Sequence, residues 1–163
     1  MKDAGISSGQ RSADDALVLQ FGHLVAAAGR LSYILGRPLE QEFGISHATF
    51  EALVILARAG DDGLSMGQIA QEQVLSSGGV TRLIDRMEAA GLVCRQPDPD
   101  DRRGRRVRLT AAGQDLVARA SRRHAENVRR YFLEPLPPDD REQFITNLRT
   151  LSYAARDVLP RLP

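Results

Sequence analysis

An arginine-rich stretch between two short apolar segments constrains this chain most. Residues 92–94 are apolar, residues 98–108 read DPDDRRGRRVR, and Leu109 and Thr110 precede a new helical pattern. Five arginines fall between positions 102 and 108, and Gly104 among them lets the chain turn tightly. The pattern predicts a β-hairpin with a basic tip. Such a tip either contacts a polyanion or is a solvated turn whose charges keep the protein soluble.

Length and composition limit the class of protein. The chain has 163 residues, of which 42% are hydrophobic, enough for one domain or for a core with an attached dimerisation layer. It has no run of eighteen apolar residues, and its first fifteen residues lack a secretion signal, so we expect a cytoplasmic protein without a membrane segment. The single cysteine, Cys94, excludes an intramolecular disulfide and is expected to be buried as a small hydrophobe.

Helical periodicity surrounds the hairpin. Residues 1–12 read as a disordered tail, and apolar residues then recur at three- and four-residue steps from Asp14 to about residues 36–38. Ser46 is an expected N-cap of a helix that stops at Gly60, and Ser65 is an expected cap of a short third helix. A further helix begins at residue 76 or 77 and ends at Gly91.

Two more helices are expected after the hairpin. Thr110 is suited to cap a helix that runs to about Leu133, and Asp139 begins a last one that ends at Pro160. The predicted fold class is mainly α (α+β): a winged helix-turn-helix with a two-strand wing, and long N- and C-terminal helices that form a dimerisation layer. The apolar surface of those terminal helices exceeds what this small core can cover, so we expect a homodimer.

The helix before the hairpin carries the candidate chemistry. Arg82 and Arg86 are four residues apart and share one face, close to Gly78 and Thr81. The free N–H groups at the helix start favour an anion such as a phosphate, and arginines further along reach base edges. Alternatively, this is an exposed face on which the arginines pair with Asp85 or Glu88. The helix-turn-helix and the basic hairpin together favour the first interpretation.

The stretch from Leu64 to Gly113 resembles the signature of the MarR family of bacterial transcription regulators, above all in VTRLIDRME followed by DPDDRRGRRVRLTAAG. The order of the flanking helices is similar too. The resemblance implies homodimers on pseudopalindromic double-stranded DNA operators, usually repressors released by a small molecule. It divides the chain into the tail (1–12), a helical dimerisation region (13–60 and 114–160) and a DNA-binding region (61–113).

The same resemblance assigns roles to residues. It places the helix 76–90 in the major groove and the wing 97–106 at the minor groove, with Arg103 as the groove probe and Asp101 as the acid that braces the wing. The arginines at 102, 105, 106 and 108 are left for backbone contacts or solvation. The expected DNA-binding residues are Ser76, Ser77, Gly78, Thr81, Arg82, Arg86, Asp101, Arg103 and Arg105.

An effector pocket of the kind found in that family would lie between the dimer helices and the DNA-binding region. By position its lining residues are His23, Arg30, Tyr33 and Phe50, with His47 nearby, a set suited to an aromatic carboxylate. His23 and Tyr33 are otherwise packing or interface residues. No cofactor and no metal are expected, and the absence of a nucleophile with a paired base argues against an enzyme. The alternative class is a winged-helix module that binds protein or RNA.

Overall fold

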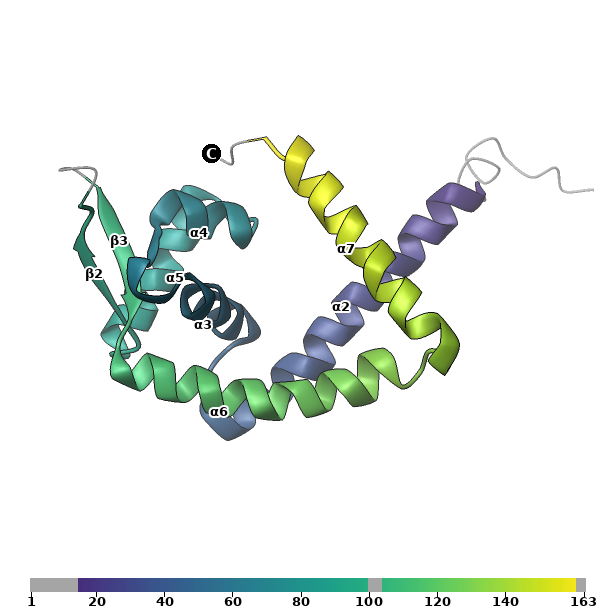
Figure 1. Cartoon of the computed structure of the whole chain (residues 1–163), viewed down its shortest axis with the longest axis horizontal. Helices are drawn as coiled ribbons and strands as arrows, with labels where there is room; N and C mark the ends of the chain where they lie inside the picture. Colours follow the sequence, from purple (N-terminus) through teal and green to yellow (C-terminus); the bar gives the residue numbers. More distant parts are fainter. Residues whose placement is uncertain (1–14, 100–103, 161–163) are drawn as a thin grey trace, which may run out of the picture. The chain divides into compact units, whose positions relative to one another are not determined.

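The computed structural model describes residues 15–99 and 104–160, and the chain divides into two units, Met1–Ile34 and Leu35–Pro163 (Figure 1). The expected tail at residues 1–12 therefore lies outside the described residues. The helices and strands in chain order are α2 (Ala16–Phe43), α3 (His47–Ala59), the 3₁₀ helix η1 (Gly60–Asp62), β1 (Leu64–Ser65), α4 (Met66–Glu72), α5 (Ser77–Ala89), β2 (Val93–Pro97), β3 (Arg105–Leu109), α6 (Ala111–Val128), the π-helical turn η2 (Arg129–Leu133), the 3₁₀ helix η3 (Pro138–Asp140) and α7 (Arg141–Val158).

The first unit consists, in its described part, of α2 up to Ile34 and the residue before it. Its apolar side chains are exposed: Leu17 is 75% exposed and Phe21 65%. By length and composition alone α2 could also cross a membrane, although one such helix near the N-terminus is weak evidence for a span. Gln20, His23 and Arg30 interrupt its apolar sequence.

Helix α2 continues into the second unit and runs further than the sequence predicts. The expected end at residues 36–38 is wrong, because Pro38 lies inside the helix, which continues to Phe43. Burial of Leu35 and Leu39 stabilises this last part of the helix against the loss of one backbone hydrogen bond at the proline. Gly44, with φ +68°, follows its end.

The expected helix caps at Ser46, Ser65 and Thr110 are confirmed, and Ser76 is a further cap. Ser46, Ser65, Ser76 and Thr110 each accept a hydrogen bond from the backbone N–H three residues later, over 3.1–3.2 Å. At Ser65 the cap is reciprocal, since Gln68 Oε1 accepts from the Ser65 N–H at 2.8 Å. The predicted start at residue 76 or 77 is thus resolved, with Ser76 as the cap and Ser77 as the first residue of α5. Helix α7 starts at Arg141 rather than Asp139, because residues 138–140 form η3.

The sheet has three antiparallel strands in the order β1-β3-β2, where the sequence predicts two. Strands β2 and β3 form the expected hairpin, with Val93 opposite Leu109 and Arg95 opposite Val107. The additional strand is Leu64–Ser65, which pairs with Val107 and Arg106. The wing is therefore joined through β1 to the start of α4.

One hydrophobic core holds the second unit together. Leu53, Ile69, Ile84 and Val107 are each completely buried, and they come from α3, α4, α5 and β3 respectively. Helix α6 packs on α3, and α4 packs on α5. The hairpin extends beside α4 and α5, and α6 leads from it towards α7 (Figure 1). This packing fixes α5 and the base of the wing on one rigid support.

Candidate nucleic-acid interface

Helix α5 separates its residues into a buried and an exposed face. Its apolar residues Val80, Leu83, Ile84 and Met87 are buried in the core. The opposite face is exposed, as predicted, and consists of Ser77, Gly78, Thr81, Arg82, Asp85 and Arg86. The Ser76 side chain caps the Gly79 N–H at 3.2 Å, whereas the preceding N–H groups of the first turn have no intrahelical partner. The exposed start of α5 thus offers N–H donors and small side chains.

The acidic residues of α5 pair with an arginine from the wing. Arg95 on β2 contacts Asp85 at 2.6 Å and also contacts Glu88, which accepts the Arg95 backbone N–H at 3.0 Å. Burial lowers the pKa of Arg95, but the hydrogen bonds to both carboxylates outweigh it and raise the pKa above its usual value. The intrahelical pairs considered for Asp85 and Glu88 are not formed. Among the described residues, Arg82 and Arg86 have no ion pair.

In the described part of the wing, the acid that acts as a brace is Asp98. Arg106 Nε contacts Asp98 Oδ2 at 2.9 Å, and the Asp98 N–H donates to the Gly104 carbonyl at 3.1 Å. Arg105 is exposed at the end of β3. The expected brace Asp101 and probe Arg103 both lie outside the described residues, so their roles stay predictions.

Two arginines of the wing are not the solvated side chains that the sequence suggested. Arg106 is half-buried in its pair with Asp98, and Arg108 is half-buried with its Nε atom out of contact with water. Both side chains lie on one face of the hairpin because they are two residues apart on β3. Cys94 is half-buried rather than fully buried.

Sequence reasoning missed Arg95. It occupies a position opposite Val107, on the hairpin face that packs against α5. A charged residue at such a position requires a partner, and the acids of α5 supply it. The sequence does contain a signal for this pair. Alternate residues of β2 lie on opposite faces, and the acids at positions 85 and 88 are available to pair with an arginine on the face that meets α5.

The expected effector residues fall in separate units. His23, Arg30 and Tyr33 are exposed on α2 in the first unit, whereas Phe50 is buried in the second. Phe50 lines an open cavity of about 720 Å³ between α3 and α6. Its ring lies 4.6 Å from that of His124, which in turn lies 5.7 Å from the ring of His47.

His124 in this cavity has an unusual environment. Burial, and then the nearby His47, lower the pKa of His124 below its usual value. Its Nδ1 atom is buried and has no hydrogen-bond partner in the described part of the chain. In the same part of the chain, no three metal-binding side chains lie close enough together to hold an ion.

Helix α5 with its serine cap, the short helix α4 before it and the braced hairpin after it share one core, and together they define the class: a winged helix-turn-helix protein. Residues 43–104 match the sequence model of the MarR family. The chain is 31% identical over 121 residues to the HTH-type transcriptional regulator YkoM of Bacillus subtilis, covering 74% of this chain and 77% of that protein. It is 30% identical over 132 residues to the regulator PecS of Dickeya dadantii, covering 78% and 76%.

Solved structures agree with these sequence relatives. AbsC, a MarR family transcriptional regulator from Streptomyces coelicolor, is 26% identical, with a TM-score of 0.75 over 94% of this chain and 98% of that one. MepR of S. aureus in complex with DNA has the same fold, at 24% identity and a TM-score of 0.69 over 80% of this chain and 94% of that one. The chain belongs to the MarR family of transcriptional regulators, and this membership excludes the enzyme class.

Proposed function

We propose that the chain is a homodimeric DNA-binding repressor that inserts α5 into the major groove of a pseudopalindromic operator. One observation carries this proposal: α5 presents Arg82 and Arg86 on its exposed face without an acid partner in the described part of the chain, because Arg95 engages both neighbouring acids. Guanidinium groups that are free of internal pairs remain available for phosphates and guanine edges.

The start of α5 suits close approach to the DNA backbone. A Cβ atom at Gly78 would meet nothing within 4 Å, so this side of the helix is open to a ligand. The unpaired N–H groups of the first turn and the positive end of the helix dipole favour a phosphate. Ser76, Ser77 and Thr81 add hydroxyl groups on the same exposed surface. In this proposal these groups fix the register of the helix, and Arg82 and Arg86 contact both phosphates and guanine edges.

The wing supplies a second contact. Asp98 and Arg106 hold the two ends of the hairpin tip together, and Arg105 is exposed beside them. We assign Arg103 as the probe of the adjacent minor groove and Asp101 as an additional brace, as the family resemblance implies. A narrow A·T-rich groove attracts such an arginine through its negative potential.

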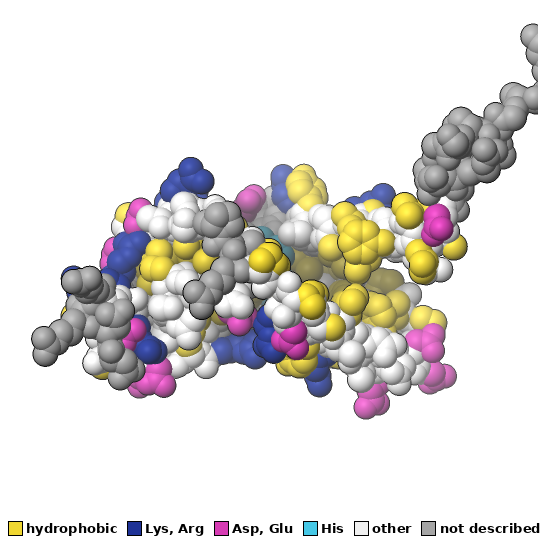
Figure 2. Space-filling view, turned by 90° about the horizontal axis from the view of Figure 1, so that it is seen from above, with side chains coloured by type: hydrophobic (Ala, Val, Ile, Leu, Met, Phe, Trp, Pro, Cys, Tyr) yellow, Lys and Arg dark blue, Asp and Glu magenta, His cyan; other side chains and the backbone are white. Residues whose placement is uncertain are grey.

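Dimerisation would use the terminal helices. Exposed hydrophobic side chains gather over them (Figure 2), including Leu17 and Phe21 on α2 and Leu151 and Val158 on α7. So much exposed apolar surface on two helices favours a partner subunit. Two copies of α5 reach successive major grooves only if they lie about 34 Å apart. The same role implies a cytoplasmic protein that is not inserted in a membrane.

Release of the repressor by a small effector is the last part of the proposal. We propose the cavity beside Phe50, with His47 and His124, as the effector site. His23, Arg30 and Tyr33 of α2 stay candidate effector residues by their position in the sequence. Arg30 would pair with the carboxylate of an aromatic acid.

DNA binding is measured with fluorescein-labelled duplexes that carry the sequences flanking the gene of this protein. We expect Arg82→Ala and Arg103→Ala to weaken specific binding about tenfold or more, at 1–3 kcal/mol for each lost base contact. Arg122→Ala removes an exposed arginine from α6 and serves as the matched control. Unchanged binding by both test variants would overturn the assignment. Binding to single-stranded RNA or to protein, with none to duplex DNA, would support the alternative interaction module.

A further inference from the structure

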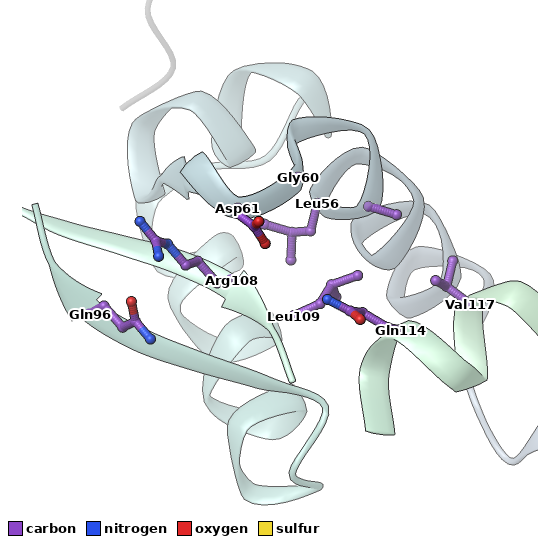
Figure 3. Close-up of a pocket in the computed structure, with 9 residues that line it drawn as sticks. Leu56, Gly60, Asp61, Gln96, Arg108, Leu109, Gln114 and Val117 are labelled. Carbon is purple, nitrogen blue, oxygen red and sulfur yellow. The ribbon is translucent and has the colours of Figure 1, made fainter. Parts of the chain in front are cut away.

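A second cavity lies on the side of the wing that faces away from α5. It has a volume of about 370 Å³, at the small end of ligand sites, which span roughly 300–1,000 Å³. Its walls come from the end of α3, the strands β2 and β3, and the first turns of α6 (Figure 3). Gln96 and Arg108 line it from the hairpin, and they alternate with Arg95 and Val107, which face α5. The cavity is therefore separate from the candidate nucleic-acid interface.

The cavity contains a guanidinium group without a partner. Arg108 Nε is buried and forms no hydrogen bond within the described residues. The stem of Arg108 is held in place by close packing, since a Cβ atom at Gly63 would lie 2.7 Å from Arg108 Cγ. The terminal nitrogens of Arg108 also have no hydrogen-bond partner among the described residues, and they are not among the buried atoms. They are therefore the donors that a ligand in the cavity can reach.

Charged and aliphatic side chains line different parts of the cavity. In Figure 3 the side chains of Arg108 and Gln96 lie towards one end, Leu109, Leu56 and Val117 lie towards the other, and the Gln114 amide lies beside Leu109. The lining includes no aromatic side chain, so an aromatic ligand would find no ring to stack on. Leu56 and Val117 are buried and offer a fixed aliphatic surface.

We propose that this cavity binds a small aliphatic monocarboxylate, whose carboxylate pairs with Arg108 and whose chain lies on Leu56, Leu109 and Val117. A planar guanidinium pairs with a carboxylate through two parallel hydrogen bonds, and the Gln96 amide adds a donor at the same end. Asp61 on the cavity wall repels the ligand and limits its affinity. An occupied site would connect the base of the wing to α3 and α6.

The site is tested without DNA, so its outcome is independent of the proposed function. Hexanoate is titrated into the ¹⁵N-labelled full-length protein, and amide shifts are followed by NMR. We expect saturable shifts at Gly60, Gln96, Leu109 and Gln114, with a Kd of about 1 mM for a ligand of this size. Hexanamide has the same shape without the charge, and it is expected to bind about tenfold more weakly. Equal shifts by both compounds, or shifts confined to the cavity beside His124, would overturn the proposal.

Variants show whether hexanoate binds through a pair between its carboxylate and Arg108 or only through apolar contacts. Arg108→Ala removes no side-chain hydrogen bond within the described residues and is expected to weaken hexanoate binding about tenfold. Arg58→Ala, an exposed arginine on α3 outside the cavity, is the matched control and should bind hexanoate like the wild type. If Arg108→Ala does not fold, Asp61→Asn provides the test: removing this carboxylate should tighten binding about twofold. The assignment would be contradicted if Arg58→Ala and Arg108→Ala bound hexanoate with equal affinity. It would also be contradicted if Asp61→Asn bound hexanoate more weakly than the wild type.

Discussion

The pairing of Arg95 with the acids of α5 predicts a measurable energetic coupling between the wing and α5. The Arg95 side chain is 24% exposed, Glu88 39% and Asp85 56%, so the pairs are only partly screened by water. Exposed ion pairs contribute about 0.2–1 kcal/mol each, and the additional hydrogen bond to the Arg95 backbone orients Glu88. We therefore expect Arg95→Ala to lower the free energy of unfolding by about 1–2 kcal/mol.

Urea denaturation measures this loss, and a double-mutant cycle isolates its source. Combining Arg95→Ala with Glu88→Gln should give a coupling energy of about 1 kcal/mol that decreases in high salt. Arg119→Ala breaks an i,i+4 pair with Asp115, whose side chains are 53% and 68% exposed, and should cost only about 0.5 kcal/mol. A coupling energy near zero, or an equal loss from Arg119→Ala, would refute the reasoning.

Three further predictions concern stability. Gly63→Ala should lower the free energy of unfolding in urea by about 3 kcal/mol, because the new Cβ would lie 2.5 Å from the Val107 carbonyl oxygen and φ is +63°. Gly44→Ala, where φ is +68° but the space is open, should lower it by only about 1 kcal/mol. Because folding lowers the pKa of His124, the unfolded chain binds more protons, so the free energy of unfolding should decrease as pH falls below about 6.5. His124→Gln should reduce this pH dependence. Ser65→Ala removes the reciprocal cap and should cost about 1 kcal/mol, and a loss near zero would contradict that role.

Much of the fold follows from local signals in the sequence. Ser46, Ser65, Ser76 and Thr110 mark the helix starts because a hydroxyl that caps an N–H three residues later is a short-range interaction. The exposed face of α5 was predictable for the same reason, since the helical period places Arg82 and Arg86 together. The β1 strand was not, because two residues have no periodicity and are ordered only by pairing with β3.

Long-range pairing is what the sequence could not provide. The stretch DPDDRRGRRVR offers several acids and arginines, and spacing alone does not decide that Asp98 pairs with Arg106. The Arg95 pairs join β2 to α5, seven and ten residues away, and depend on which hairpin face packs on the helix. The continuation of α2 through Pro38 likewise depends on burial of Leu35 and Leu39, which overrides the local preference of proline.

The salt dependence of operator binding tests the central claim most directly. If Arg82 and Arg86 from two subunits neutralise about four phosphates, log K should fall with log salt with a slope of about −3.6, or roughly 100-fold between about 50 and 200 mM. The doubly substituted protein Arg82→Ala/Arg86→Ala should show a much shallower slope. Wild-type binding that does not change over this range, or the same slope in both proteins, would contradict the account.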